Sequence, residues 1–157
     1  MTLDRATALF FDASALFSAS HSPLSGSSFL VLACTNGYLR AVVSPDVLIE
    51  AERNLLGKST MQAFTRYRDI VAVTPLRMVS APDRATVLHY EPAFFEDAHV
   101  VAAALASSAQ YLVTLDQRLA SRVRQVDLPI IAISPRDFIQ TVLPGHPEYL
   151  EIRALNQ

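Results

Sequence analysis

The sequence predicts a single α/β domain built around a mostly parallel β-sheet. A length of 157 residues suits one domain. With 51% hydrophobic and 18% charged residues, the chain can bury a core and is not expected to be disordered. Five short apolar runs alternate with longer segments of helical spacing, which is typical of parallel strands joined by helices. These runs are residues 6–11, 38–43, 70–73, 111–115 and 130–133.

Capping signals place the helices of the first half. Residues 27–36 have helical spacing and precede the second apolar run. Ser44 followed by Pro45 combines an N-cap with a proline at the first helical position, where its missing N–H costs nothing. We expect that helix to end at Gly57. Ser59 is expected to cap the next helix.

The second half repeats this pattern. Helical spacing covers residues 95–107 and 116–124, and the pair Ser134-Pro135 opens a last helix. Residues 76–94 are harder to assign, because two prolines flank a short helical stretch at 83–89. This segment is either a lid over a site at the sheet edge or a plain connection.

Residues 1–143 form the predicted domain, and residues 144–157 a C-terminal tail or arm. Cys34 is the only cysteine, so an internal disulfide is excluded, and its apolar neighbours predict a small buried side chain. No apolar run approaches the roughly 20 residues of a transmembrane helix. The N-terminus lacks the pattern of a signal peptide. We therefore expect a cytoplasmic protein.

Four acidic residues are placed where one site could form. Asp12 directly follows the first apolar run and Asp116 follows the fourth. Glu50 lies in the helix after the second run, and Asp97 opens the helix that leads into the fourth. Ligands of open parallel sheets bind at the carboxyl ends of the strands, so we expect all four side chains at one edge. Singly, each aspartate is more typical of a helix cap, and Glu50 of a solvated helix face. The joint pattern indicates a site.

Such a group of carboxylates favours a divalent cation. Converging carboxylates repel one another unless cations neutralise them. Oxygen ligands suit Mg²⁺ or Mn²⁺, and these ions activate water and neutralise the leaving oxygen in phosphodiester hydrolysis. A zinc site is not expected, since the four histidines are dispersed and no second cysteine joins them. The net charge of −2 is not typical of a basic nucleic-acid-binding domain, so contacts to a nucleic acid would have to be local.

Three segments of the sequence resemble the motifs of PIN domains. The first is FFDASALF around Asp12, and the second is SPDVLIEAERNL with its helical Glu50. The third and most specific is EDAHVVAAALASSAQYLVTLDQRL, in which an aspartate, an alanine-rich helix and an apolar strand precede Thr-x-Asp. The order and approximate spacing of the four acids agree with the family. The likeness covers roughly residues 7–140.

The resemblance implies a three-layer α/β/α fold with a five-stranded, mostly parallel sheet in the order 3-2-1-4-5. It also implies a set of catalytic and metal-binding acids, which are Asp12, Glu50, Asp97 and Asp116. Ser14 and Thr114 match positions that support these acids by hydrogen bonding. Many single-domain bacterial members are VapC-type toxins, which are Mg²⁺-dependent endoribonucleases, often homodimeric, held inactive by a small antitoxin. The implied partners are therefore RNA, an antitoxin and a second copy of the chain, with no membrane.

The sequence departs from the family after its last motif. Several relatives carry a further acid there, whereas Gln117 and Arg118 stand in this chain. One metal ion is therefore the simpler expectation, with Glu96 as a candidate substitute for the missing acid. Contacts to the RNA backbone are expected from arginines, because a guanidinium binds phosphate through two hydrogen bonds. The candidates are Arg53, Arg118 and Arg122, each of which could equally belong to a solvated helix face.

Two other functions are compatible with part of the pattern. A PIN-like domain could bind nucleic acid or a protein with little or no turnover. A phosphoaspartyl enzyme could use Asp12 as its nucleophile. That second alternative is weak, because the last strand is followed by Ser134 where a receiver domain needs lysine, and Ser14 stands where a haloacid-dehalogenase-type phosphatase needs a second aspartate.

Overall fold

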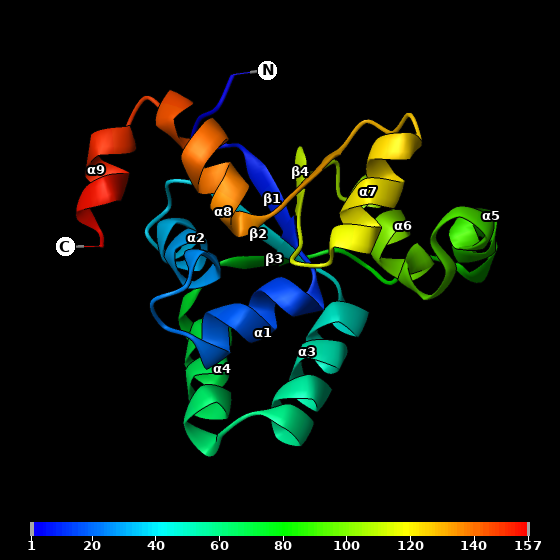
Figure 1. Cartoon of the computed structure of the whole chain (residues 1–157), viewed down its shortest axis with the longest axis horizontal. Coiled ribbons are helices and arrows are strands. Elements are labelled where there is room, and N and C mark those ends of the chain that lie inside the picture. Colours follow the sequence, from blue (N-terminus) through cyan, green and yellow to red (C-terminus); the bar gives the residue numbers. More distant parts are fainter. Residues whose placement is uncertain (1, 157) are drawn as a thin grey trace.

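The computed structural model of the protein describes residues 2–156, which form a five-stranded sheet surrounded by helices (Figure 1). The strand order is β3-β2-β1-β4-β5, and every neighbouring pair is parallel. The strands are β1 (Ala8–Phe11), β2 (Arg40–Val43), β3 (Leu76–Met78), β4 (Tyr111–Val113) and β5 (Ile131–Ile133). The helices are α1 (Ala13–His21), α2 (Gly26–Thr35), α3 (Pro45–Lys58), α4 (Met61–Val73), α5 (Arg84–Phe94), α6 (Ala98–Ala106), α7 (Gln117–Gln125), α8 (Pro135–Asp137) and α9 (Tyr149–Ala154). A 3₁₀ turn, η1 (Phe95–Asp97), precedes α6, and a π-helical turn over Phe138–Val142 extends α8.

This architecture confirms the predicted α/β class and strand order. Crossovers between parallel strands are right-handed as a rule, so this order places α1 to α4 on one face of the sheet and α5 to α7 on the other. Helix α8 returns to pack against α2. The order reverses between β1 and β4, and ligands of such folds bind at the carboxyl ends of the strands at this switch point. The starts of α1, α3 and α7 gather there, near the centre of Figure 1.

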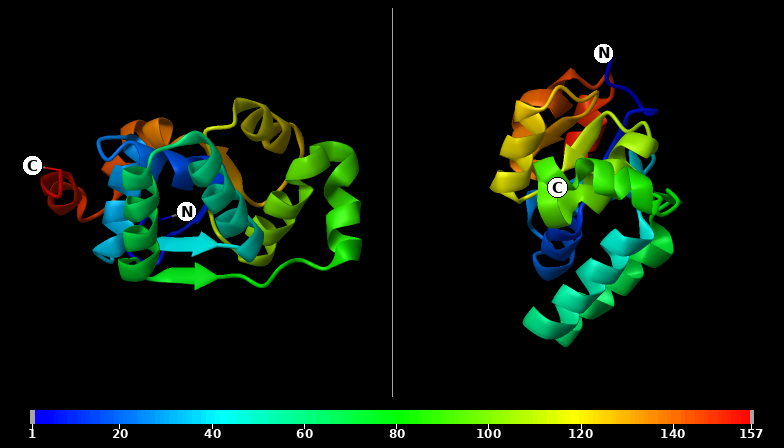
Figure 2. Two further views of the ribbon diagram at one scale, coloured as in Figure 1. Left: turned by 90° about the horizontal axis from the view of Figure 1, so that it is seen from below. Right: turned by 90° about the vertical axis from the view of Figure 1, so that its right-hand side faces the viewer.

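The middle of the sheet is buried on both sides. Phe10, Phe11 and Leu112 are fully inaccessible to solvent, as expected for parallel strands covered by helices on both faces. Helices α3 and α4 pack together and project away from the sheet (Figures 1 and 2). Within residues 2–156, the helices are too short or too polar to cross a membrane. Cys34 is buried, as the sequence predicted.

The third strand is not where the sequence analysis placed it. Residues 70–73, expected as a strand, instead continue α4. That helix ends where the N–H of Thr74 donates to the carbonyl of Ile70 (2.9 Å), and the strand is Leu76–Met78. A run of four apolar residues does not by its period distinguish helix from strand. Here α4, which begins at Met61, continues through residues 70–73.

Three helix boundaries also differ from expectation. Helix α3 continues past Gly57 to Lys58. Thr60, not Ser59, caps α4 by accepting the N–H of Ala63 (3.1 Å). Helix α5 is longer than the stretch 83–89 and continues through Pro92 to Phe94, although proline has no N–H to donate to the preceding turn. The segment 76–94 therefore contains strand β3 and helix α5, which begins the connection to β4. Helix α5 packs against α6.

The residues after 143 are anchored to the rest of the domain. Ile152 in α9 is fully buried, and His146 is only 3% exposed. The His146 Nε2 lies 2.8 Å from the carbonyl oxygen of Tyr38. His146 and Ile152 thus anchor this segment to the domain. The domain boundary at residue 143 stays a prediction.

Candidate active site

The register of β1 and β4 brings Asp12 next to Thr114. Phe11 pairs with Val113, so the two residues that follow leave the sheet side by side. The Thr114 hydroxyl donates a hydrogen bond to Asp12 Oδ2. Both side chains are buried. Thr114, which the sequence predicted as a supporting residue, therefore contacts the carboxylate directly.

Ser14 supplies a second hydroxyl to the same carboxylate. Its Oγ donates to Asp12 Oδ1 at 2.6 Å and accepts the backbone N–H of Leu115 at 3.0 Å. Thr114 Oγ1 in turn accepts the N–H of Asp116 at 3.0 Å. Two backbone N–H groups are thus linked to Asp12 through two hydroxyls. This network fixes the position of the carboxylate and ties it to the loop that carries Asp116.

The three aspartates at helix starts differ in their capping role. Asp12 Oδ1 accepts the N–H of Ala15 (3.0 Å) and so caps α1. Asp116 Oδ1 accepts the N–H groups two and three residues ahead (3.0 and 3.2 Å) and caps α7. Asp97 stands at the start of α6 but makes no capping hydrogen bond. Capping therefore accounts for part of the hydrogen bonding of Asp12 and Asp116. It does not explain why an aspartate stands at position 97.

Glu50 reaches the site from the side. It is exposed on α3, beside the buried stripe of Val47, Ala51 and Leu55. The negative charge of Glu50 raises the pKa of both Asp12 and Asp97. The charges of Asp116, Asp12 and Glu50 thus all act on Asp97, and the charge of Glu50 also acts on Asp12.

The electrostatics of the site are unfavourable for negative charge. Burial raises the pKa of Asp97 to about 6, and the next largest cause is the charge of Asp116. Further contributions of the same sign come from Glu96, Asp12 and Glu50. Burial also raises the pKa of Asp12, against the opposing effect of its hydrogen bonds from Ser14, Thr114 and Ala15. Perturbed carboxyl groups of this kind are typical of functional sites.

The donor set suits a hard divalent cation in kind. The acids offer only oxygen ligands, and Asp12 Oδ2 receives one hydrogen bond from residues 2–156, which leaves a lone pair free. Within that same part of the chain, no three His, Cys, Asp or Glu side chains are placed to hold a metal ion together. The charges of the other acids act on Asp97, but Glu50 and Asp116 are exposed, so the side chains would have to rearrange to share one ion.

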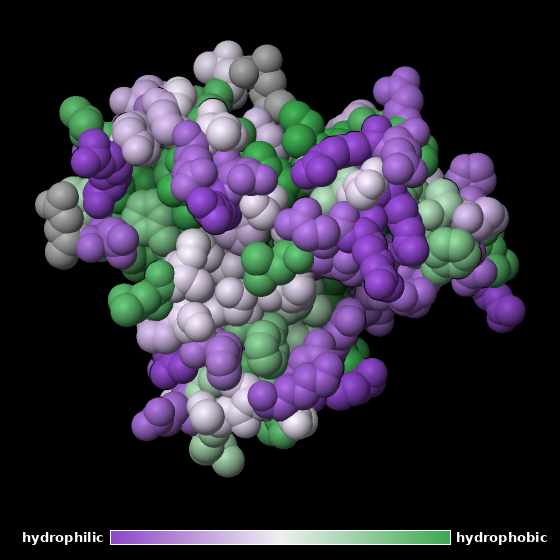
Figure 3. Space-filling view, in the orientation of Figure 1, coloured by the Kyte–Doolittle hydropathy of each residue, from purple (hydrophilic) through white to green (hydrophobic). Residues whose placement is uncertain are grey.

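The arginines named as RNA contacts lie on two sides of this site. Arg118 and Arg122 are on α7, directly after Asp116, and Arg53 is exposed on α3. Hydrophilic side chains gather over α7 on the face shown in Figure 3. The Arg122 guanidinium carbon lies 4.9 Å from the ring centroid of Phe95. Arg122 is thus held over an aromatic ring, whereas Arg53 and Arg118 have no side-chain hydrogen bond or ion pair within residues 2–156.

Phe95 is a residue at this site that the sequence analysis did not name. Its φ of 53° lies in the left-handed region, which residues other than glycine adopt at a cost in free energy. Its ring is 56% exposed, and it directly precedes Glu96 and Asp97. Backbone strain of this kind clusters at functional sites. The sequence does not show that the ring of Phe94 is buried, that the ring of Phe95 is exposed, or that the backbone of Phe95 is strained.

We expect Phe95→Gly to be more stable than Phe95→Ala by about 1 kcal/mol, because both lose the ring and only glycine relieves the left-handed backbone. Urea unfolding of the two variants measures this difference without reference to activity. An alanine variant as stable as the glycine variant would show that the backbone at Phe95 is not strained.

Comparison with known proteins agrees with this fold. A family profile described as "PIN domain" matches residues 8–118, which is more than half of the chain. The structure is similar to the crystal structure of PAE2754 from Pyrobaculum aerophilum, with a TM-score of 0.62 and 16% identity over 96% of this chain and 97% of that one. It is also similar to VapBC2 from Rickettsia felis bound to a DNA fragment from their promoter, with a TM-score of 0.57 and 14% identity over 82% of this chain and 98% of that one.

At these identities the two solved structures support the fold alone. No curated protein sequence matches the chain. The profile match spans all four acids, Asp12, Glu50, Asp97 and Asp116. The chain therefore belongs to the PIN-domain family.

Proposed function

We propose that this protein is a Mg²⁺- or Mn²⁺-dependent endoribonuclease. The observation that carries the proposal is the gathering of carboxylates at the switch point, where burial and then the charge of Asp116 raise the pKa of Asp97 to about 6. PIN domains are generally nucleases. Close carboxylates are electrostatically unfavourable unless a cation neutralises them. In a PIN domain, such a cluster is suited to metal-assisted phosphodiester hydrolysis.

The residues divide the work of the site. Asp12, Glu50, Asp97 and Asp116 would hold the ion, and Gln117 and Arg118 in place of a further acid favour one ion over two. A bound divalent ion supplies positive charge that activates water and stabilises the leaving oxygen. Ser14 and Thr114 fix the position of the Asp12 carboxylate by donating to it, and these hydrogen bonds favour its ionised form. Arg53, Arg118 and Arg122 would bind the phosphates on either side of the scissile bond.

The biological setting of the proposal is a toxin–antitoxin pair. A similar structure is a VapBC2 assembly bound to promoter DNA. We infer that this chain is likewise a toxin, homodimeric and cytoplasmic, and held inactive by a small antitoxin. Co-purification with the product of a small adjacent reading frame would support this assignment.

The direct test is cleavage of a mixed RNA pool with Mg²⁺, Mn²⁺ or EDTA. We expect cleavage with either metal, none in EDTA and none by Asp97→Asn under any condition. Asp69→Asn, which changes an exposed aspartate on α4, is the matched control and should cleave like wild type. RNA binding without cleavage under all metals would overturn the proposal in favour of a binding module.

A further inference from the structure

A basic cavity lies at the end of the sheet opposite the acidic site. It is lined by the amino ends of β1 and β2, by β3 and by the residues just before β4, and its volume is about 590 Å³. Three arginines face it, which are Arg5, Arg40 and Arg77, and no acidic residue lines it. In a chain of net charge −2, this local excess of positive charge is not explained by composition.

The sheet register places two of these arginines together. Ala8 pairs with Arg40, and Val42 pairs with Arg77. Because side chains alternate along a strand, Arg40 and Val42 share a face, and Arg77 lies on that face too. The two guanidinium groups thus enter the cavity from neighbouring strands on the same side of the sheet.

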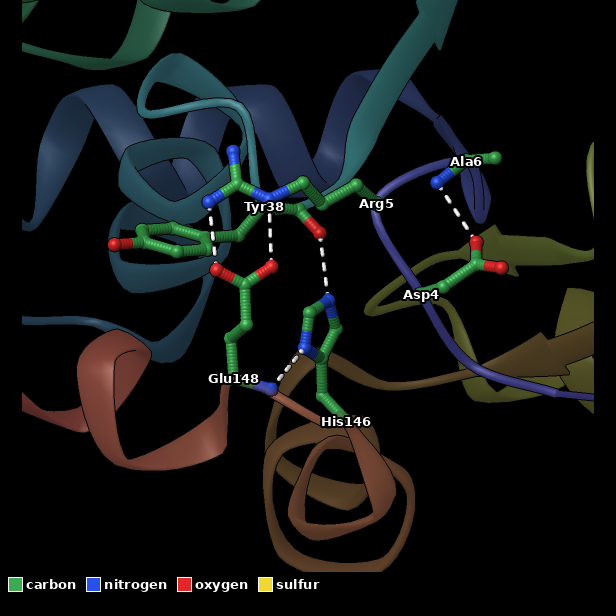
Figure 4. Close-up of polar contacts among 6 residues, drawn as sticks. All are labelled: Asp4, Arg5, Ala6, Tyr38, His146 and Glu148. Carbon is green, nitrogen blue, oxygen red and sulfur yellow. Dashed lines mark hydrogen bonds and ion pairs between the residues drawn. The ribbon is translucent and has the colours of Figure 1, made fainter.

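Only one of the three arginines is neutralised. Arg5 makes a two-pronged ion pair with Glu148 at 2.6 Å and stacks on Tyr38 (Figure 4). Arg77 is oriented by one hydrogen bond to the carbonyl of Ser107 at 2.6 Å and keeps its other donors free. Arg40 has no side-chain hydrogen bond or ion pair within residues 2–156. Two guanidinium groups that line one cavity without a paired carboxylate favour an anion there.

The rest of the cavity indicates what kind of anion fits. Leu39, Cys34 and Ala41 provide apolar walls, and Gln110 adds a side-chain amide whose oxygen is already engaged by the N–H of Ala8 (2.7 Å). A volume of about 590 Å³ is larger than one phosphate needs and falls in the range of small-molecule sites. We propose that the cavity binds a nucleoside monophosphate, with its phosphate held by Arg40 and Arg77. This assignment does not depend on nuclease activity.

The test is isothermal titration calorimetry in EDTA on an Asp97→Asn background, so that the acidic site takes no part. Adenosine 5′-monophosphate is expected to bind more tightly than inorganic phosphate, and adenosine is expected not to bind. Arg40→Gln should weaken binding of the monophosphate about tenfold, the effect of losing one charge-assisted contact. Arg68→Gln, an exposed arginine on α4, is the matched control and should bind like its parent.

The substitution at Arg40 is preferred over one at Arg77, because Arg77 also holds the end of α6 and its loss could affect folding. A 5′-phosphorylated RNA oligonucleotide distinguishes a free nucleotide from an RNA end. Tighter binding of the oligonucleotide than of the monophosphate would overturn the assignment to a free nucleotide. Absence of heat with the monophosphate at millimolar concentrations, or equal affinities of the Arg40 variant and its parent, would overturn the site itself.

Discussion

Asp12→Asn is expected to lower the RNA cleavage rate by about a thousandfold, the size of losing one strong electrostatic contribution to a transition state. The same substitution is expected to leave the metal-free protein at least as stable as wild type. Burial raises the pKa of Asp12, so the charged form is disfavoured in the folded state, and a neutral amide avoids that cost. Asparagine is also as good a helix N-cap as aspartate, so the start of α1 is preserved.

Single-turnover cleavage and urea unfolding in EDTA measure the two effects separately. Asp83→Asn is the matched control, because Asp83 caps α5 through the N–H of Thr86 (2.8 Å) but lies outside the site. If Asp12 were only a cap, both variants would cleave RNA like wild type. If the cleavage defect of Asp12→Asn came with an equal loss of folded protein, its cause would be structural. Either result would contradict a catalytic role.

The stability of the metal-free protein is expected to fall between about pH 4 and about pH 7 more in wild type than in Asp97→Asn. The unfolded Asp97 ionises near its ordinary pKa of 3.8, whereas the folded group ionises near 6. Between these values the folded state binds more protons, so stability is lost as the pH rises through that window. The excess loss is about 1 kcal/mol once solvent screening of this half-buried group is allowed for.

Mn²⁺ should reverse this loss. A cation bound only by the folded state adds about 2.7 kcal/mol at a hundredfold excess over its Kd. The gain is expected to be larger at pH 7 than at pH 5, because protons compete for the carboxylates at the lower pH. Urea unfolding of wild type, Asp97→Asn and Asp69→Asn at both pH values, with and without Mn²⁺, provides the comparison. Equal gains at the two pH values would show that Asp97 does not take part in binding.

The sequence by itself determined the central part of the fold. The apolar runs that end at Asp12 and Asp116 are long enough and well enough bounded to identify β1 and β4 with the acids at their carboxyl ends. The four acids were named from their spacing. The third strand was misplaced because a short apolar run carries no reliable period, and α4 extended through it. Local patterns thus determine a strand or helix only where they are long or clearly capped.

Only the tertiary structure decided which side chains meet. The register of β1 and β4 sets Thr114 next to Asp12, and the register of β2 and β3 sets Arg77 beside Val42, on the face of the sheet that Arg40 shares. Neither placement is visible in the sequence, because the partners come from distant segments and each pairing depends on hydrogen bonds between strands. The same holds for Phe95, whose backbone angle follows from the turn between α5 and α6. The sequence therefore identifies the acids. The packing of the sheet determines the hydrogen bonds of Asp12 and the raised pKa values of Asp12 and Asp97. It also forms the basic cavity at the other end of the sheet.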